Sequence, residues 1–236
     1  MITIKVPATS ANIGPGFDSL GLALSLYLTL EIHEPTDSWK VFHDYGDSMP
    51  SDQNNFIVST ALCIAPSLKP HRLVVKSDIP LARGLGSSSS ALIAALSMVN
   101  ILDNKQYTKE DLLQIATKLE GHPDNVAPAI FGGAVAAYYD GTTVFHTPLH
   151  FPRSLSFVTC IPDYQLLTEK ARAALPKDLP FIQAVAASAI SNTLVVALAG
   201  NSIETARHLI EQDQFHEEAR AHLAPELTII RRIAHQ

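Results

Sequence analysis

Four hydroxyl-bearing residues stand in a row after a glycine-rich turn, in residues 84–90 (GLGSSSS). Glycine has no Cβ atom, so the backbone N–H groups of such a loop can close on an anion. An apolar stretch with helical spacing follows, and the free amides and dipole at a helix N-terminus attract negative charge. The segment predicts a phosphate site, although it lacks the Gly-Lys-Ser/Thr of a Walker A loop. A flexible glycine–serine linker is the alternative.

A second loop of small residues lies near the start of the chain, in residues 6–21 (VPATSANIGPGFDSLG). Glycines and prolines hold Asn12 and Asp18 between two stretches of strand-like sequence. An amide and a carboxylate placed in this way can bind a small polar ligand. The alternative is an ordinary turn, in which Asn and Asp side chains bond to their own backbone.

A third segment, residues 120–133 (EGHPDNVAPAIFGG), places Glu120, His122, Asp124 and Asn125 within six positions. Mg²⁺ takes few protein oxygens and leaves its other positions to phosphate and water. A carboxylate here can therefore complete a magnesium site with a serine of the phosphate loop. The alternative is a solvated helix C-terminus, where His122 interacts favourably with the helix dipole.

The elements that must position these loops are visible in the hydrophobic pattern. Alternation predicts strands at 2–6, 26–32, 72–76, 133–139 and 155–161. Helical spacing predicts helices after residue 90, from Thr108 to residue 119, and at 168–175, 181–199, 202–211 and 213–235. Asp111 completes a capping signal with Thr108. Strands followed by helices favour an α+β fold, divided near residue 150 into domains 1–150 and 151–236.

The composition excludes several classes of protein. Of the 236 residues, 47% are hydrophobic and 17% charged, which excludes a disordered chain. A net charge of −6 without a Lys/Arg run argues against nucleic acid or an anionic membrane as partner. Residues 179–203 are uncharged, but polar residues at their centre favour a buried helix or helix pair over a span. Two distant cysteines and no signal-peptide pattern lead us to expect a cytoplasmic protein.

Together the three segments resemble the GHMP kinase superfamily, and within it the homoserine kinases. Residues 80–91 are similar to the family's ATP loop, 7–18 to its N-terminal signature, and 120–133 to the segment most specific to the homoserine branch. The resemblance covers essentially the whole chain. It implies an N-terminal domain like domain 2 of ribosomal protein S5 and a ferredoxin-like C-terminal domain, with ATP between them.

One feature departs from the family pattern. The family carries a third glycine-rich motif near its C-terminus, and this chain reaches Gln236 without one. We therefore expect the C-terminal domain to be incomplete, either because the sequence is truncated or because the protein is naturally short.

The resemblance implies transfer of the ATP γ-phosphoryl group to the side-chain hydroxyl of L-homoserine, giving O-phospho-L-homoserine on the route to threonine. It places Mg²⁺ at Ser88 (or Ser87) and Glu120, and gives Asn125 the task of orienting the reacting groups. These three, Ser88, Glu120 and Asn125, are the expected catalytic residues. No general base is named, although Asp124 is available.

The remaining site residues follow from the same resemblance. The expected ATP-binding residues are Pro80, Leu81, Ala82, Arg83, Gly84, Leu85, Gly86, Ser87, Ser88, Ser89 and Ser90. The expected substrate-binding residues are Asn12, Asp18, His122, Asp124, Arg172 and Arg220, with the two arginines on the substrate carboxylate. On sequence alone, a solvated helix face is the favoured interpretation of each arginine.

Two other interpretations stay open at this point. One is another GHMP kinase that acts on mevalonate-type or sugar alcohols, which lack the substrate ammonium group. The other is a nucleotide- or amino-acid-binding remnant with weak catalysis, motivated by the missing motif. The expected partner is a small molecule, with neither nucleic acid nor a membrane, and a homodimer is an open alternative to a monomer.

Overall fold

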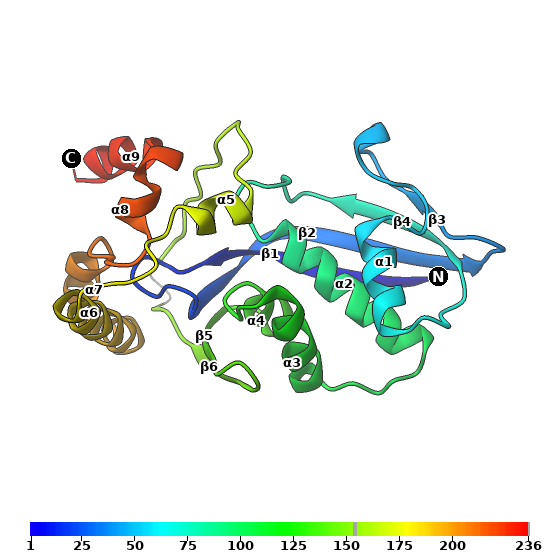
Figure 1. The fold of residues 1–236 in the computed structure, drawn as a ribbon, viewed down its shortest axis with the longest axis horizontal. Coiled ribbons are helices and arrows are strands. Elements are labelled where there is room, and N and C mark those ends of the chain that lie inside the picture. The colour runs from blue at the N-terminus through cyan, green and yellow to red at the C-terminus, as the bar shows by residue number, and fades with distance from the viewer. Residues whose placement is uncertain (153–154, 236) are drawn as a thin grey trace.

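The computed structural model describes residues 1–152 and 155–235 (Figure 1). Its centre is a six-stranded sheet in the order β3-β4-β2-β5-β6, with β1 paired to β2. The parallel pair is β3–β4, and the other described pairs are antiparallel. The strands are β1 (Ile2–Ala11), β2 (Leu20–Pro35), β3 (Lys40–Phe42), β4 (His71–Ser77), β5 (Ala134–Tyr139) and β6 (Val144–Leu149).

The 16-residue strand β2 connects the two ends of the sheet. Its first residues, from Leu20 to Leu22, pair with β5, whereas residues 28–35 pair with β4. Strand β1 pairs with both parts of β2. The β1–β2 connection therefore lies where β2 meets β5, and it carries Asn12 and Asp18.

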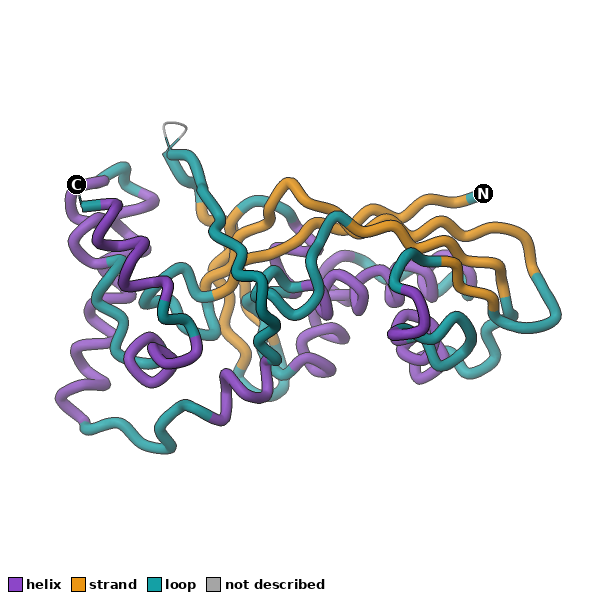
Figure 2. Tube along the Cα trace, turned by 90° about the horizontal axis from the view of Figure 1, so that it is seen from above, coloured by secondary structure: helices purple, strands orange, loops and turns teal. Residues whose placement is uncertain are grey.

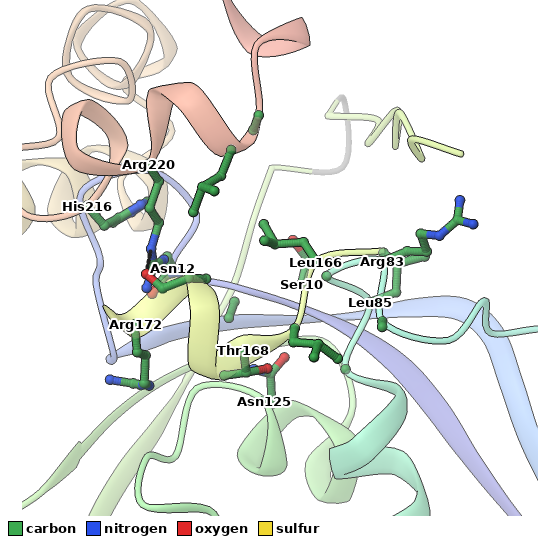
Figure 3. A pocket seen from close by; sticks show the side chains of 18 of the residues that line it. Ser10, Asn12, Arg83, Leu85, Asn125, Leu166, Thr168, Arg172, His216 and Arg220 are labelled. Carbon is green, nitrogen blue, oxygen red and sulfur yellow. Dashed lines mark hydrogen bonds between the residues drawn. The ribbon is translucent and has the colours of Figure 1, made fainter. Parts of the chain in front are cut away.

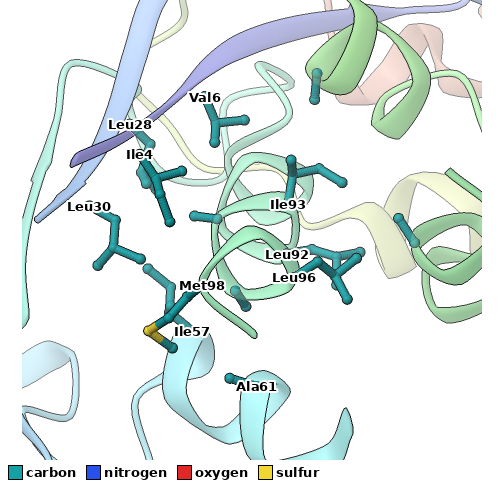
Figure 4. Close-up of a cluster of buried hydrophobic side chains, with 14 of the residues drawn as sticks. Ile4, Val6, Leu28, Leu30, Ile57, Ala61, Leu92, Ile93, Leu96 and Met98 are labelled. Atoms are coloured by element: carbon teal, nitrogen blue, oxygen red, sulfur yellow. The ribbon is translucent and has the colours of Figure 1, made fainter. Parts of the chain in front are cut away.

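Helices cover one face of this sheet, as the view from above shows (Figure 2). The central helix α2 has little charge, and Leu96, Met98 and Val99 on it are completely buried. They belong to one apolar core with side chains of β1, β2 and α1 (Figure 4). Each such side chain stabilises the fold by roughly 1.5–3 kcal/mol. The four helices are α1 (Phe56–Ile64), α2 (Ser87–Leu102), α3 (Lys109–Glu120) and α4 (Val126–Phe131).

The start of α3 confirms the predicted capping signal. The Thr108 hydroxyl accepts a hydrogen bond from the Asp111 N–H at 3.1 Å, and the Asp111 carboxylate accepts one from the Thr108 N–H at 2.9 Å. Gly121 ends the helix at φ +91°, a left-handed conformation that suits glycine. The chain therefore turns sharply after Glu120 and enters the polar segment 122–125.

The C-terminal part of the chain is helical throughout residues 155–235 wherever regular structure is described. Leu194 and Leu198 form a second, smaller core with Leu20, Leu22 and Leu149 of the sheet. Helix α6 has the predicted bounds, and its length and composition alone would suffice to cross a membrane, but it buries one face against this core. The helices are α5 (Thr168–Ala173), α6 (Phe181–Ala199), α7 (Ile203–Leu209), α8 (Glu217–Arg220) and α9 (Glu226–Ala234).

Two predictions for this part are wrong. Residues 155–161 form no strand, because no neighbouring described strand supplies hydrogen-bond partners. Val158 in this segment is 90% exposed. The predicted helix 213–235 is interrupted between α8 and α9, where Pro225 lacks a donor N–H. A ferredoxin-like sheet is thus not seen among residues 155–235. The sequence pattern also missed β3, α1, α4 and β6, which are short or lack clear periodicity.

Candidate active site

A cleft of about 780 Å³ brings the three polar sequence segments together with the C-terminal helices (Figure 3). Most predicted site residues line it, and Arg172 of α5 and Arg220 of α8 close its C-terminal side. Pro80, Leu81 and Ser90 are not among the lining residues that the structure describes. The cleft is therefore built from segments that lie far apart in the sequence.

The phosphate loop turns into α2 through Gly86, which has φ +62°. A Cβ atom here would overlap Thr9 Oγ1, so glycine is required for both space and conformation. Ser90 does not face the cleft because its hydroxyl donates to the Pro7 carbonyl at 2.8 Å. The free N–H groups at the start of α2 lie beside the cleft, in the position that an anion prefers.

A hydroxyl and a carboxylate meet at the floor of the cleft. The Ser89 hydroxyl donates to Glu120 Oε1 at 2.9 Å. The family resemblance pairs Glu120 with Ser88 (or Ser87) instead; Ser88 is exposed, and both serines line the cleft. Hard oxygen ligands of this kind fit Mg²⁺, so the residues present suit the metal that the family resemblance implies.

His122 and Asp124 form a buried pair beside the β1–β2 connection. His122 Nδ1 lies 2.5 Å from Asp124 Oδ1. Burial by itself lowers the pKa of His122, but the hydrogen bond and charge of Asp124 outweigh it, and the pKa is raised above 6.5. This corner of the cleft therefore favours a protonated imidazole next to a carboxylate.

Asp18 and Arg172, both expected from the family resemblance to bind the substrate, pair with each other. The guanidinium donates to both carboxylate oxygens, at 2.6 and 3.1 Å. Asn12 supports this arrangement because its Oδ1 accepts the Asp18 N–H at 2.9 Å. Both Asn12 and Asp18 have positive φ, which places backbone strain in the binding loop.

Arg220 lies next to this pair. Its Nε donates to the Ala171 carbonyl at 2.8 Å, which ties α8 to α5. Burial, and secondly the charge of Arg172, lower the pKa of the Arg220 guanidinium. The ring of Phe17 lies 5.5 Å from Arg220 and 5.8 Å from Arg172, within reach of a cation–π interaction with each.

Sequence reasoning missed Phe17 and His216. The His216 ring lies 5.3 Å from Phe17, and its Nε2 is 3.1 Å from the Gly14 carbonyl. These contacts join residues about 200 positions apart, so no local pattern reveals them. The available signals were the place of Phe17 inside the N-terminal signature and of His216 one helical turn before Arg220.

A short strap connects the C-terminal side of the cleft to the phosphate loop. The Leu166 N–H donates to the Ala82 carbonyl at 2.8 Å, and Arg83 donates to the Pro162 carbonyl. Arg83 is therefore engaged with the chain before α5. Residues 162–166 lead directly into the helix that carries Arg172.

Comparison with known proteins agrees with this architecture. Residues 55–133, from α1 through the phosphate loop to the end of α4, match the GHMP kinases N terminal domain. The homoserine kinase of Leuconostoc mesenteroides is 66% identical over all 236 residues, which cover 81% of its length. The homoserine kinase of Streptococcus thermophilus is 51% identical over 233 residues and 81% of its length.

A solved structure gives the same result. A Listeria monocytogenes protein assigned as a homoserine kinase superposes with a TM-score of 0.84 at 43% identity, covering 98% of this chain and 78% of the other. The chain therefore belongs to the homoserine kinases of the GHMP kinase family, with the α+β fold of that family.

Proposed function

We propose that this chain transfers the γ-phosphoryl group of ATP to the side-chain hydroxyl of L-homoserine, forming O-phospho-L-homoserine for threonine biosynthesis. The observation that carries the proposal is a single cleft with a phosphate loop at one end and paired arginines and carboxylates at the other. High identity to homoserine kinases over the whole chain supports it. We place the enzyme in the cytoplasm.

ATP lies with its triphosphate against the loop from Gly84 to Ser89, at the N-terminus of α2. Glu120 and the hydroxyl of Ser88 or Ser89 would hold Mg²⁺, which would supply neutralisation of charge on the phosphate oxygens. Support comes from the Ser89–Glu120 contact at the cleft floor and from the exposed position of Ser88. Ser90 is then a structural anchor of the loop and not a phosphate ligand.

Homoserine binds at the opposite end by exchange of ion pairs. The ammonium group of homoserine replaces Arg172 as the partner of the Asp18 carboxylate. The carboxylate of homoserine then pairs with Arg172 and Arg220. The Asp18–Arg172 pair supports this because it offers the two charges that a zwitterion needs, already facing each other. His122 and Asp124 complete the polar wall of this end.

The acceptor hydroxyl then lies between the two ends, where Asn125 orients it toward the γ-phosphate. Phosphoryl transfer depends mainly on positioning and on stabilisation of charge, because its transition state is loose. We therefore assign no general base. Asp124 Oδ1 is already engaged by His122.

An acceptor screen tests the proposal. Purified chain with ATP and Mg²⁺ should release ADP with L-homoserine, and ³¹P NMR should identify O-phospho-L-homoserine. Mevalonate and a sugar alcohol serve as competing acceptors, and Glu120→Gln and Ser88→Ala as variants with impaired turnover. ADP release with homoserine no faster than with ATP alone would overturn the proposal, and calorimetric ATP binding without turnover would favour a binding remnant.

A further inference from the structure

Thr9 lies at the junction of the phosphate loop and the segment that carries Asn125. It is completely buried in β1, and its hydroxyl donates to Asn125 Oδ1 at 2.8 Å across 116 positions of sequence. Its backbone N–H donates to the Leu85 carbonyl at 3.1 Å. On the other side Gly86 packs so closely that a Cβ atom there would overlap the Thr9 hydroxyl.

The hydrogen bond determines which end of the Asn125 amide faces the cleft. Oδ1 accepts from Thr9, whereas Nδ2 has no hydrogen-bond partner among residues 1–152 and 155–235. Turning the amide over would let Nδ2 donate to the Thr9 hydroxyl oxygen, but it would leave the buried Thr9 O–H without an acceptor among the described residues, which is unfavourable. Asn125 therefore presents a donor to the cleft.

A donor is the end that the reaction needs. The oxygens of a γ-phosphoryl group accept hydrogen bonds and do not donate them, and the oxygen of the attacking hydroxyl also has lone pairs to offer. An amide turned the other way would present Oδ1, an acceptor that repels the phosphate oxygens. Thr9 also fixes the spacing between Asn125 and the phosphate loop, because its backbone N–H donates to the Leu85 carbonyl.

We infer that Thr9 is a positioning residue for phosphoryl transfer, which holds the Asn125 amide with Nδ2 toward the reacting oxygens. The inference rests on the role proposed above for Asn125. Thr9 itself contacts neither substrate in this arrangement, since it lies behind Asn125 and Gly86 and does not line the cleft.

Two pairs of variants test the role of the hydroxyl. Thr9→Val keeps the shape of the side chain and loses the hydroxyl, whereas Thr9→Ser keeps the hydroxyl and loses the methyl group. We expect Thr9→Val to lower kcat about tenfold or more, with the KM values of ATP and homoserine within about twofold. Thr9→Ser should retain kcat within about threefold. If Thr9→Val folds poorly, Thr9→Ala against Thr9→Ser makes the same comparison.

A double-mutant cycle separates this inference from the proposed function. Thr9→Val in an Asn125→Ala background should have no further effect on kcat, because its target is gone. An Asn125→Ala variant with wild-type kcat would overturn the proposed role of Asn125. Two results would overturn the inference about Thr9 alone. One is a wild-type kcat in Thr9→Val, and the other is that Thr9→Val lowers kcat by the same factor in the Asn125→Ala background as in the wild type. Thermal unfolding of each variant checks that the fold is retained.

Discussion

The two sides of the cleft are built in different ways. The side with the phosphate loop belongs to a sheet covered by four helices, and its central helix α2 is buried along most of its length. The side with the two arginines consists of helices α5 to α9, of which α5, α8 and α9 contain no buried residue. The first side is held by a large apolar core, whereas the second is held by a small core under α6 and α7 and by individual polar contacts.

This difference matches the chemistry that we propose for each side. Phosphoryl transfer depends on positions fixed to a fraction of an ångström, so the phosphate loop and Asn125 lie on the well-packed side. An amino acid zwitterion is recognised by charges, which act over longer distances and tolerate small movements. The arginines lie on short helices tied by bonds such as those from Arg220 to Ala171 and from Arg172 to Asp18.

The largest expected effect is on the well-packed side. Gly86→Ala should lower kcat/KM for ATP more than about 100-fold, because the new methyl group overlaps Thr9 Oγ1 and approaches Asn125 Oδ1 within 3.1 Å. Gly46→Ala is the control for backbone strain: Gly46 also has positive φ, at +57°, no atom lies within 4 Å of its would-be Cβ, and it does not line the cleft. Steady-state kinetics should separate the two variants, and equal losses would show that backbone strain alone matters.

The two cores should differ in the cost of truncation. Leu96 and Leu194 are both completely buried, the first in the large core and the second in the small core under α6. We expect Leu96→Ala to cost about 3–4 kcal/mol of unfolding free energy and Leu194→Ala about 2 kcal/mol, since α6 can shift to fill its cavity. Urea denaturation measures both values. A greater cost at Leu194 would contradict the contrast between the two sides.

On the polar side, removal of an arginine should affect substrate binding more than catalysis. Arg220→Ala is expected to raise the homoserine KM roughly tenfold or more while leaving the ATP KM nearly unchanged, because a charged hydrogen bond is worth about 1.5–3 kcal/mol. Arg231→Ala is the control, since Arg231 pairs with Glu217 at 2.7 Å and does not line the cleft. An unchanged homoserine KM in Arg220→Ala would reject the carboxylate role.

The smallest expected effect concerns pH. Because the folded pKa of His122 is raised above 6.5, its contribution to stability is complete below about pH 6.5 and is lost as the pH rises through the folded pKa. Asp124→Asn removes the two largest raising contributions and leaves burial and the charge of Arg172 against the smaller raising charge of Asp18, so the pKa of His122 should fall. NMR titration of the imidazole measures this change, with Asp37→Asn as a distant control. A pKa still above 6.5 in Asp124→Asn would show that other charges raise it.

The sequence predicted long elements on both sides of the cleft and missed short ones, among them β3, α1, α4 and β6 of the well-packed side. Helical spacing and the Thr108–Asp111 capping signal located α2 and α3, because both depend on neighbours a few residues apart. The predicted strand 155–161 failed because a strand also needs a partner, which local sequence does not reveal.

For the site as well, the sequence reveals groups that are close along the chain but not contacts between distant segments. The expected site residues are about half of those that line the cleft, and most of them lie in motifs that are continuous in sequence. They did not distinguish Ser89 from Ser88 beside Glu120, because adjacent residues of a helix point in different directions. They also did not predict that Asp18 and Arg172 pair with each other, a contact that only the folded chain creates.

The contacts that close the cleft have a consequence for how the protein folds. Thr9 meets Asn125 across 116 positions, Asp18 meets Arg172 across 154, and Gly14 meets His216 across 202. Closing such long loops costs chain entropy before the contact repays it, and a chain emerging from the ribosome lacks the distant partner for most of its synthesis. The phosphate loop can thus pack with its sheet early, whereas the amino acid end of the cleft waits for α8. Within the described cleft, the phosphate end can therefore form before the end that recognises the amino acid.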